Sequence, residues 1–158
     1  MGKKATKAAD SIYCLARYEA ATQDERFSSR EKASEVTGID RTKLARIELG
    51  NVTPYPDEVL SMAQAYNTPE LCNAYCAEEC PIGKTTVKKV VMDDFDRLSL
   101  KVLGSLKNVD GLMNGLISIS EDGRVDTDEI ESFNEILDEL DKIATSAQAL
   151  KIWAQKNI

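Results

Sequence analysis

Apolar residues in the second half of the chain recur at alternating steps of four and three, the spacing of one face of a continuous helix. This stripe is interrupted once, by Ser105, and comprises Val91, Phe95, Leu98, Val102, Val109, Leu112, Leu116 and Ile119. A helix of that length spans on the order of 45 Å at ~1.5 Å per residue, more than a compact small domain needs internally. The stripe therefore predicts a long helix that packs against another elongated element.

A second stripe supplies that element. It follows the polar segment 120–128 and comprises Ile130, Phe133, Leu137, Leu140, Ala144, Ala147 and Ala154. Two such helices joined by a polar turn predict an antiparallel hairpin over residues 85–158, for dimerisation or partner binding.

Two details of the hairpin follow from its composition. Glycine costs up to ~1 kcal/mol relative to alanine in a helix interior, and Gly104, Gly111 and Gly115 interrupt the first stripe. A break near residues 108–111 is therefore compatible with the pattern. The hairpin, or a dimer, is expected to be sealed by Leu150, Ile152 and Trp153.

The first half of the chain is divided into five short helices. Ser28 and Glu31 form a capping-box pair, and Asp40 is a good N-cap. The predicted helices span residues 11–21, 28–37, 41–49, a segment that Asp57 caps and that runs to Tyr66, and 68 to about 80. No alternation is long enough to predict a strand, so the fold is expected to be all-α, with a five-helix domain over residues 10–80.

The same spacing predicts which side chains point inward and which outward. The inward residues of the first, third and fourth helices are Ile12, Leu15, Ala16, Leu44, Ile47, Val59, Leu60 and Ala63. The outward residues of the third helix are Arg41, Thr42, Lys43 and Arg46. Two short helices joined by a glycine turn are what a helix-turn-helix needs, because one helix braces while the other enters the major groove. Arginine on that helix can pair in bidentate fashion with a guanine edge.

The segment 29–50 resembles the XRE, or lambda-repressor-like, family of helix-turn-helix regulators. The likeness lies in Gly38, in the run Arg-Ile-Glu-x-Gly that ends at Gly50, and in the order of five helices over about the first 80 residues. The resemblance implies binding of double-stranded DNA in the major groove. It places Arg41, Thr42 and Arg46 at base edges and Arg30 at the start of the bracing helix.

The bracing helix departs from the family pattern. Ala33 and Ser34 stand where Leu and Ala are usual, and Thr37 replaces a larger aliphatic residue, so we expect looser packing there. Weaker candidates for phosphate contacts are Arg17, Lys43 and a basic arm formed by Lys3, Lys4 and Lys7.

Charge is distributed unevenly along the chain. There are 27 acidic and 20 basic residues, a net charge of −7. Residues 1–56 hold 10 basic and 8 acidic side chains, which leaves 10 and 19 for the rest and gives about +2 and −9. This asymmetry favours different partners for the two parts, with DNA binding confined to the first.

Several function classes are disfavoured. Histidine is absent, which excludes Ser-His and Cys-His nucleophilic pairs and histidine metal ligands, so an enzyme is not expected. No apolar run approaches the ~20 residues of a membrane span, and no signal-type segment is recognised. We therefore expect a cytoplasmic protein with no membrane partner.

No cofactor is expected, but four cysteines make a metal site an alternative. Cys72, Cys76 and Cys80 recur every four residues, and Cys14 lies on a helix that could pack nearby. Four thiolates suit zinc or an iron-sulfur cluster, which would make the chain a metal or redox sensor. However, the spacing is not that of common zinc knuckles, and a buried cysteine often behaves as a small hydrophobe.

Residues 118–129 imitate an EF-hand loop, with Gly123 sixth and Glu129 twelfth. Ser118 and Ser120 lack the charge that calcium prefers at the first and third positions. The favoured interpretation is a turn that Asp126 caps and Glu129 closes. The run Gly-Lys-Thr at 83–85 lacks the remaining glycine of a phosphate-binding loop, so no nucleotide site is expected.

These patterns together predict a sequence-specific DNA-binding regulator, a dimeric repressor of bacterial or phage type. A homodimer would place two recognition helices ~34 Å apart on a palindromic operator. The alternative is an interaction or inhibitor protein, in which the acidic hairpin binds another protein and the helix-turn-helix is a scaffold or autoregulator.

Overall fold

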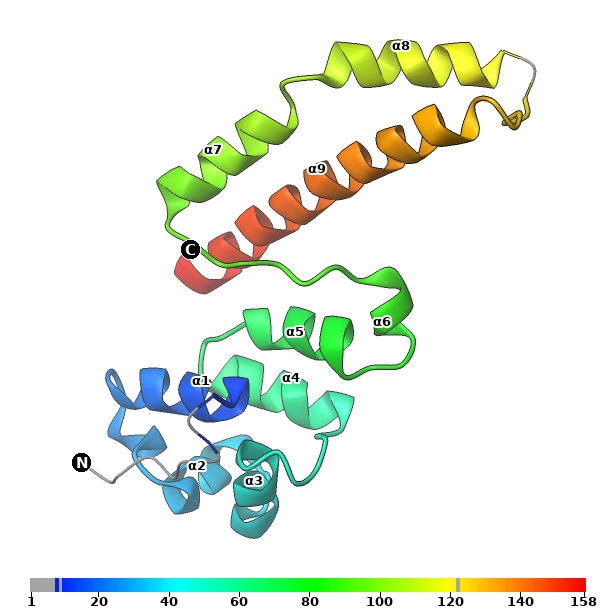
Figure 1. Cartoon of the computed structure of the whole chain (residues 1–158). Coiled ribbons are helices and arrows are strands. Elements are labelled where there is room, and N and C mark those ends of the chain that lie inside the picture. Colours follow the sequence, from blue (N-terminus) through cyan, green and yellow to red (C-terminus); the bar gives the residue numbers. More distant parts are fainter. Residues whose placement is uncertain (1–7, 9, 122) are drawn as a thin grey trace. The chain divides into compact units, whose positions relative to one another are not determined.

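The computed structural model describes residues 8, 10–121 and 123–158, and its architecture is all-α, with no strand among these residues. The chain divides into two compact units, residues 1–89 and 90–158, which we call the first and second unit (Figure 1). Within the described ranges, no helix combines the length and the apolar character that crossing a lipid bilayer requires.

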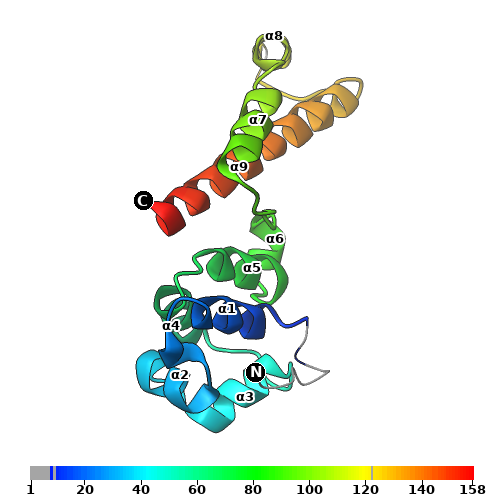
Figure 2. The same cartoon turned by 90° about the vertical axis from the view of Figure 1, so that its left-hand side faces the viewer.

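The first unit is built from short helices around one core. Its elements are α1 (Ile12–Ala21), the 3-10 helix η1 (Glu25–Phe27), α2 (Arg30–Thr37), α3 (Arg41–Glu48), α4 (Pro56–Ala65), α5 (Glu70–Glu78) and α6 (Gly83–Thr86). Within this unit α2 and α3 lie together on the side away from α5 (Figures 1 and 2). The buried core residues are Tyr13, Ala16, Phe27, Ala33, Ile39, Leu44, Ile47, Val59, Met62, Ala63, Tyr66 and Leu71.

The first unit extends beyond its predicted end near residue 80. Helix α6, which the sequence analysis did not predict, lies so close to α5 that a Cβ at Gly83 would clash with the backbone of Cys76. The side-chain amide of Asn73 on α5 donates to the carbonyl of Lys88 at 3.1 Å. These contacts fix residues 83–89 on α5.

Two helices bury faces that differ from the predicted ones. In α1, Tyr13 and Arg17 are buried while Leu15 is 41% exposed. In α4, Met62 fills the core and Leu60 is 51% exposed. The predictions for Leu15 and Leu60 were wrong. In α1 the reason is that apolar spacing does not reveal a buried polar side chain, Arg17, whose partner lies on another helix.

The helix starts are set by caps, and one of three predicted caps is as expected. The Asp40 carboxylate accepts hydrogen bonds from two amides of the first turn of α3, at 2.9 and 3.1 Å. Helix α2 is capped by Ser29 and not by Ser28, because Ser28 ends η1. Helix α4 begins after Tyr55, so that Asp57 lies within its first turn and is not its cap.

The turn between α2 and α3 is held by hydrogen bonds. Gly38 ends α2 with a φ of 71°, a left-handed conformation that favours glycine. The Thr37 hydroxyl donates to the carbonyl of Ala33 at 2.8 Å and accepts from the amide of Ile39 at 3.3 Å. The Ser61 hydroxyl of α4 donates to the Thr37 carbonyl at 2.6 Å. The expected loose packing is not seen at Ala33, which is fully buried.

The second unit is a helical hairpin with a bend in its first arm. Its helices are α7 (Phe95–Ser105), α8 (Val109–Ser120) and α9 (Ile130–Asn157), and α9 runs back along α7 and α8 (Figure 1). The prediction of one continuous helix was wrong, because residues 106–108 interrupt it. Glycine and asparagine are poor helix formers, and the side chain of Asn108 occupies the space that a Cβ at Gly111 would take.

Helix α9 packs with a face next to the predicted stripe. Its contacts with the first arm form two clusters, Val90, Leu98, Ala149 and Ile152, and Leu112, Ile119 and Ile136. Ile136 is 6% exposed, whereas Leu137 and Leu140 are 44% and 40% exposed, and Ala144 and Ala147 are exposed too. These four residues and Ile130, which is 48% exposed, were wrongly predicted to face inward, because α7 and α8 pack against a neighbouring face that contains Ile136.

The end of the hairpin is sealed by the predicted residues. Ile152 is 3% exposed, and Leu150 and Trp153 pack against the same cluster. The ring centres of Trp153 and Phe95 are 4.9 Å apart. Of the two roles expected for these residues, the structure shows the one within the hairpin.

Candidate nucleic-acid interface

Helix α3 presents polar side chains on the face opposite the core. Leu44 and Ile47 are 0% and 2% exposed, as predicted. On the other face Arg41, Thr42 and Arg46 are exposed. Neither guanidinium has an ion-pair or side-chain hydrogen-bond partner among the described residues. Both are therefore available to a ligand, on a helix that two buried aliphatic side chains hold in place.

Two other basic side chains of the first unit, Arg26 and Lys32, are paired with acids. Arg26 Nη2 lies 2.7 Å from a carboxylate oxygen of Asp24, and Lys32 Nζ lies 2.7 Å from Glu25 Oε1. Exposed ion pairs of this kind contribute little to stability. They neutralise the two cations, so that among the described arginines of the first unit the two without an acidic partner, Arg41 and Arg46, both lie on α3.

Lys43 differs from its neighbours on α3. Its ammonium lies 2.6 Å from Glu58 Oε1 and 4.1 Å from the centre of the Tyr55 ring. These contacts join α3 to the start of α4 and leave the Lys43 side chain 32% exposed. A phosphate contact by Lys43 would compete with this ion pair.

A buried carboxylate links α3 to two other helices. Glu48 is fully buried and accepts hydrogen bonds from Arg17 at 2.6 and 3.0 Å and from Arg30 at 2.7 Å. Arg17 also donates to the carbonyl of Phe27 at 3.0 Å and is only 3% exposed. The prediction that Arg17 contacts phosphate was therefore wrong, because its guanidinium is turned inward.

The charges of this network stabilise one another. Burial by itself lowers the pKa of Arg17, but the hydrogen bonds and negative charge of Glu48 raise it above its ordinary value. Removing one partner of such a buried pair typically costs about 3–5 kcal/mol. Two guanidinium groups share one carboxylate, and the side chain of Arg30 is 29% exposed, so positive charge reaches the surface here.

A shallow depression of about 530 Å³ adjoins the network at the starts of α2 and α3. Ser29, Arg30, Arg41 and Thr42 line it, together with one acid, Glu31. The first-turn amides of α3 are already bonded to the Asp40 carboxylate, so the positive charge of this depression comes from the side chains of Arg30 and Arg41. The arrangement can accept an anionic group such as a phosphate beside the exposed face of α3.

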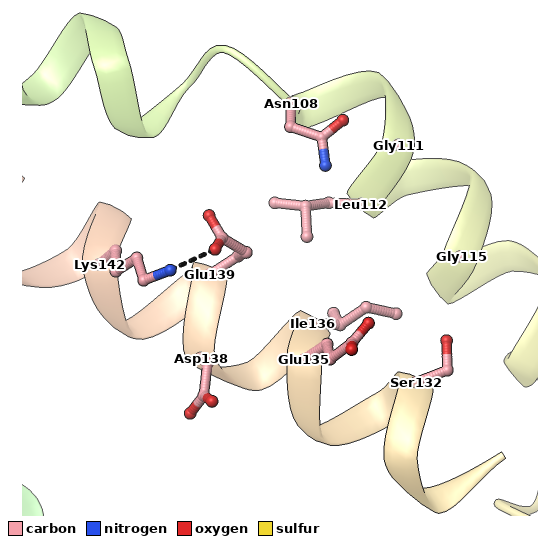
Figure 3. A pocket seen from close by; sticks show the side chains of 10 residues that line it. All are labelled: Asn108, Gly111, Leu112, Gly115, Ser132, Glu135, Ile136, Asp138, Glu139 and Lys142. Carbon is pink, nitrogen blue, oxygen red and sulfur yellow. Dashed lines mark hydrogen bonds and ion pairs between the residues drawn. The ribbon is translucent and has the colours of Figure 1, made fainter.

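A second depression, of about 500 Å³, lies between α8 and α9 and has the opposite character (Figure 3). Glu135, Asp138, Glu139 and Lys142 of α9 line it, opposite two glycines of α8. Glu139 and Lys142 form an ion pair. Three carboxylates against one ammonium repel anions, so this depression does not support nucleic-acid binding.

The cysteines are all free thiols. Cys14 is buried in α1, Cys72 and Cys76 lie in α5, and Cys80 follows its end. Burial raises the pKa of the Cys14 and Cys72 thiols, which disfavours the thiolate that binds metals. Among the residues that the structure describes, no three potential metal ligands come together, so the geometry adds no support for a zinc or iron-sulfur site.

The segment that imitates an EF-hand is only partly a loop. Ser118 and Ser120 belong to the last turn of α8. The Glu129 carboxylate accepts a hydrogen bond from the amide of Asp126 at 3.0 Å, the return bond predicted for a capping box. The prediction that Asp126 caps the following helix was wrong, because α9 begins at Ile130 with Glu129 as its N-cap. Outside the described residues lie Asp122 of this segment and the proposed basic arm, Lys3, Lys4 and Lys7.

Glu48 was not among the predicted site residues, although its spacing from Leu44 could have indicated that it is buried. Glu48 follows Leu44 by four residues and so lies on the same buried side of α3. Arg17 follows Tyr13 by four residues on α1 in the same way. A charged residue in register with core residues indicates a buried partner, because isolated buried charges are very costly.

No protein-family model, curated protein or solved structure matches this chain. The relation to helix-turn-helix regulators is therefore a resemblance of short motifs around Gly38 and Gly50.

Proposed function

We propose that the first unit binds double-stranded DNA with α3 in the major groove, and that the protein is a sequence-specific regulator of transcription. The observation that carries the proposal is the pair of exposed guanidinium groups, Arg41 and Arg46, without partners among the described residues. Guanidinium forms bidentate hydrogen bonds with guanine O6 and N7, and the Thr42 hydroxyl between them can donate or accept.

The bracing of α3 supports this role. A helix that reads bases has to keep its side chains in register with the base pairs, so it needs rigid attachment. Glu48 near the end of α3 is bonded to Arg17 of α1 and Arg30 of α2, while Leu44 and Ile47 enter the core. Two helices and the core therefore hold α3 independently of its outer face.

The surroundings of α3 support a second kind of contact, to the DNA backbone. The depression at the starts of α2 and α3 brings together the guanidinium groups of Arg30 and Arg41. Phosphate contacts of this kind fix the position of a protein on the duplex, whereas base contacts give specificity. We assign Arg30 to the backbone and Arg46, with Thr42, to base edges.

The regulator is proposed to be a repressor of bacterial or phage type that acts as two copies on a palindromic site. One small unit offers few base contacts, whereas two recognition helices ~34 Å apart on one face of the duplex double them. The net charge of −7 disfavours coating of DNA without specificity, which agrees with a localised interface.

The test is selection of bound duplexes from a random library with the full chain. Wild type is compared with Arg41→Ala/Arg46→Ala and with a control of equal charge change in the second unit, Arg97→Ala/Arg124→Ala. We expect one palindromic motif for wild type and the control, and its loss in the α3 variant. Enrichment of the same motif by the α3 variant, or of no motif by wild type, would contradict the proposal.

A second candidate, protein binding by the hairpin, is favoured by one observation on its first arm. Leu100 and Leu103 of α7 are 66% and 65% exposed, in a unit with 14 acidic and 7 basic residues. An apolar surface with an acidic surround suits a basic protein partner. Under this alternative, Arg41→Ala/Arg46→Ala leaves binding of the protein partner intact and Leu100→Ser/Leu103→Ser removes it.

A further inference from the structure

Helix α9 carries a regular apolar stripe that its own hairpin leaves uncovered. The stripe follows three-and-four spacing through Ile130, Phe133, Leu137, Leu140, Ala144 and Ala147. Ile130, Leu137 and Leu140 are 48%, 44% and 40% exposed, and both alanines are exposed. Such spacing is the pattern of a helix that pairs with another helix along its length.

This stripe is distinct from the face that holds the hairpin together. Helices α7 and α8 pack against Ile136, Ala149 and Ile152, each of which is at most 6% exposed. Phe133 is half-buried and borders both faces. One side of α9 is thus occupied within the chain, and the adjacent side is free for a partner.

We propose that α9 pairs antiparallel with α9 of a second copy of the chain through this stripe. The sizes of the side chains support the pairing, because the large residues lie in the first half of the stripe and the small ones in the second. Antiparallel alignment about Lys142 sets Leu137 opposite Ala147 and Leu140 opposite Ala144. Both of these central layers then combine one large and one small side chain, which gives an even spacing between the helices there.

The charges of α9 select the same orientation. Residues 130–142 contain five acids, Glu131, Glu135, Asp138, Glu139 and Asp141, and one base, Lys142. Residues 143–158 contain two lysines, Lys151 and Lys156, and no acid. Antiparallel pairing brings the basic half of each helix beside the acidic half of the other. A parallel pairing would place the acidic halves together and set Leu140 against Leu140.

The pairing of two copies rests on the proposed function for its biological role, because binding to a palindromic operator requires two copies. The pairing itself is measured without DNA. A failure of the pairing therefore leaves the DNA-binding proposal to its own test with Arg41 and Arg46, and a failure of DNA binding leaves the pairing untouched.

The first experiment compares solution mass by analytical ultracentrifugation over a dilution series. Ala144→Glu adds a charge at an exposed site of the single chain but at the centre of the proposed seam. Ser132→Glu adds the same charge to an exposed site of α9 off the stripe. Burying an unpaired charge should raise the dissociation constant of the dimer by about a hundredfold or more for Ala144→Glu only.

Three results decide this experiment. Dimeric wild type and Ser132→Glu with monomeric Ala144→Glu, all with the same helical circular dichroism, support the inference. Wild type that is monomeric at every concentration overturns it. An Ala144→Glu protein that dimerises as strongly as wild type overturns it too, because the seam cannot then run through residue 144.

The second experiment measures the orientation by disulfide formation in full-length chains in which Cys72, Cys76 and Cys80 are replaced by serine. In the antiparallel pair, two copies of residue 137 lie ten residues apart along the axis, about 15 Å, beyond the reach of a disulfide. We expect a mixture of Leu137→Cys and Ala147→Cys chains to cross-link under mild oxidation, and Leu137→Cys alone not to. Cross-linking of Leu137→Cys with itself would show a parallel pair and overturn the inference.

Discussion

The two units of this chain differ in which of their groups lack a partner. The first unit has 13 basic and 13 acidic residues, and it buries a carboxylate between two arginines while two guanidinium groups on α3 stay unpaired within the described residues. The second unit has 7 basic and 14 acidic residues, and it leaves apolar side chains exposed on all three of its helices.

This difference separates two tasks. Unpaired cations on a braced helix suit a polyanionic ligand, whereas a regular apolar stripe suits another helix. We therefore propose DNA recognition for the first unit and pairing of copies for the second. Variants that destabilise or alter one unit without the other test that assignment.

The largest effect is expected for Glu48→Ala. It leaves the guanidinium of Arg17 buried without its carboxylate, which should cost about 3–5 kcal/mol and unfold much of the first unit. Glu25→Ala removes the exposed partner of Lys32 and should have little effect on stability. Urea denaturation followed by circular dichroism measures both. Equal stability of the two variants would show that the network does not brace α3.

A somewhat smaller loss is expected for Leu98→Ala in the second unit. Leu98 is fully buried against α9, so the cavity should cost about 2–4 kcal/mol. Leu100→Ala, on the exposed side of the same helix, serves as the control and should be nearly neutral. Hydrogen exchange should show faster opening of α7 to α9 and unchanged protection in α3. Equal loss of protection in both units would break the comparison.

Two tyrosines of the first unit should respond in opposite directions, by about 1 kcal/mol each. The Tyr66 hydroxyl is buried and has no hydrogen-bond partner among the described residues, so Tyr66→Phe should stabilise. The Tyr13 hydroxyl donates to Glu79 at 2.6 Å, so Tyr13→Phe should destabilise. Thermal unfolding of the two variants checks this, and a lower stability of Tyr66→Phe would contradict the described packing.

A further effect is a loss of stability in alkali. Burial, with the hydrogen bond to Glu79, raises the pKa of Tyr13, and burial raises that of Tyr66, from the ordinary 10.0. Because these pKa values are raised on folding, their contribution is complete below pH 10 and declines as the pH increases above it. Tyr66→Phe should decline less steeply than wild type between pH 9 and pH 11 in urea denaturation. Identical slopes would contradict burial of this phenol.

The features predicted correctly from the sequence depend on residues that are close together in the chain. Asp40, Leu44 and Ile47 act within or next to α3, so capping and helical spacing were sufficient to predict its bounds and its two faces. Where the signal was ambiguous by one residue, as between Ser28 and Ser29, the formation of η1 decided the outcome.

What it did not predict depends on residues far apart in the chain. Arg17 and Glu48 are 31 residues apart, and their pairing turns α1 to bury a polar face. The inward face of α9 likewise depends on the bend between α7 and α8. The spacing of residues within α9 alone does not reveal that bend. The result was that Leu137 and Leu140 were expected inside the hairpin and are exposed.

The most direct test of the central claim is the base preference of Arg46→Ala at every position of the site selected by the wild-type chain. If Arg46 reads a base, the variant should lose about 1–3 kcal/mol of binding and its discrimination at one position in each half-site. Arg30→Ala should instead weaken all sequences alike. A uniform loss for Arg46→Ala, with preferences unchanged, would contradict the claim that α3 reads the sequence.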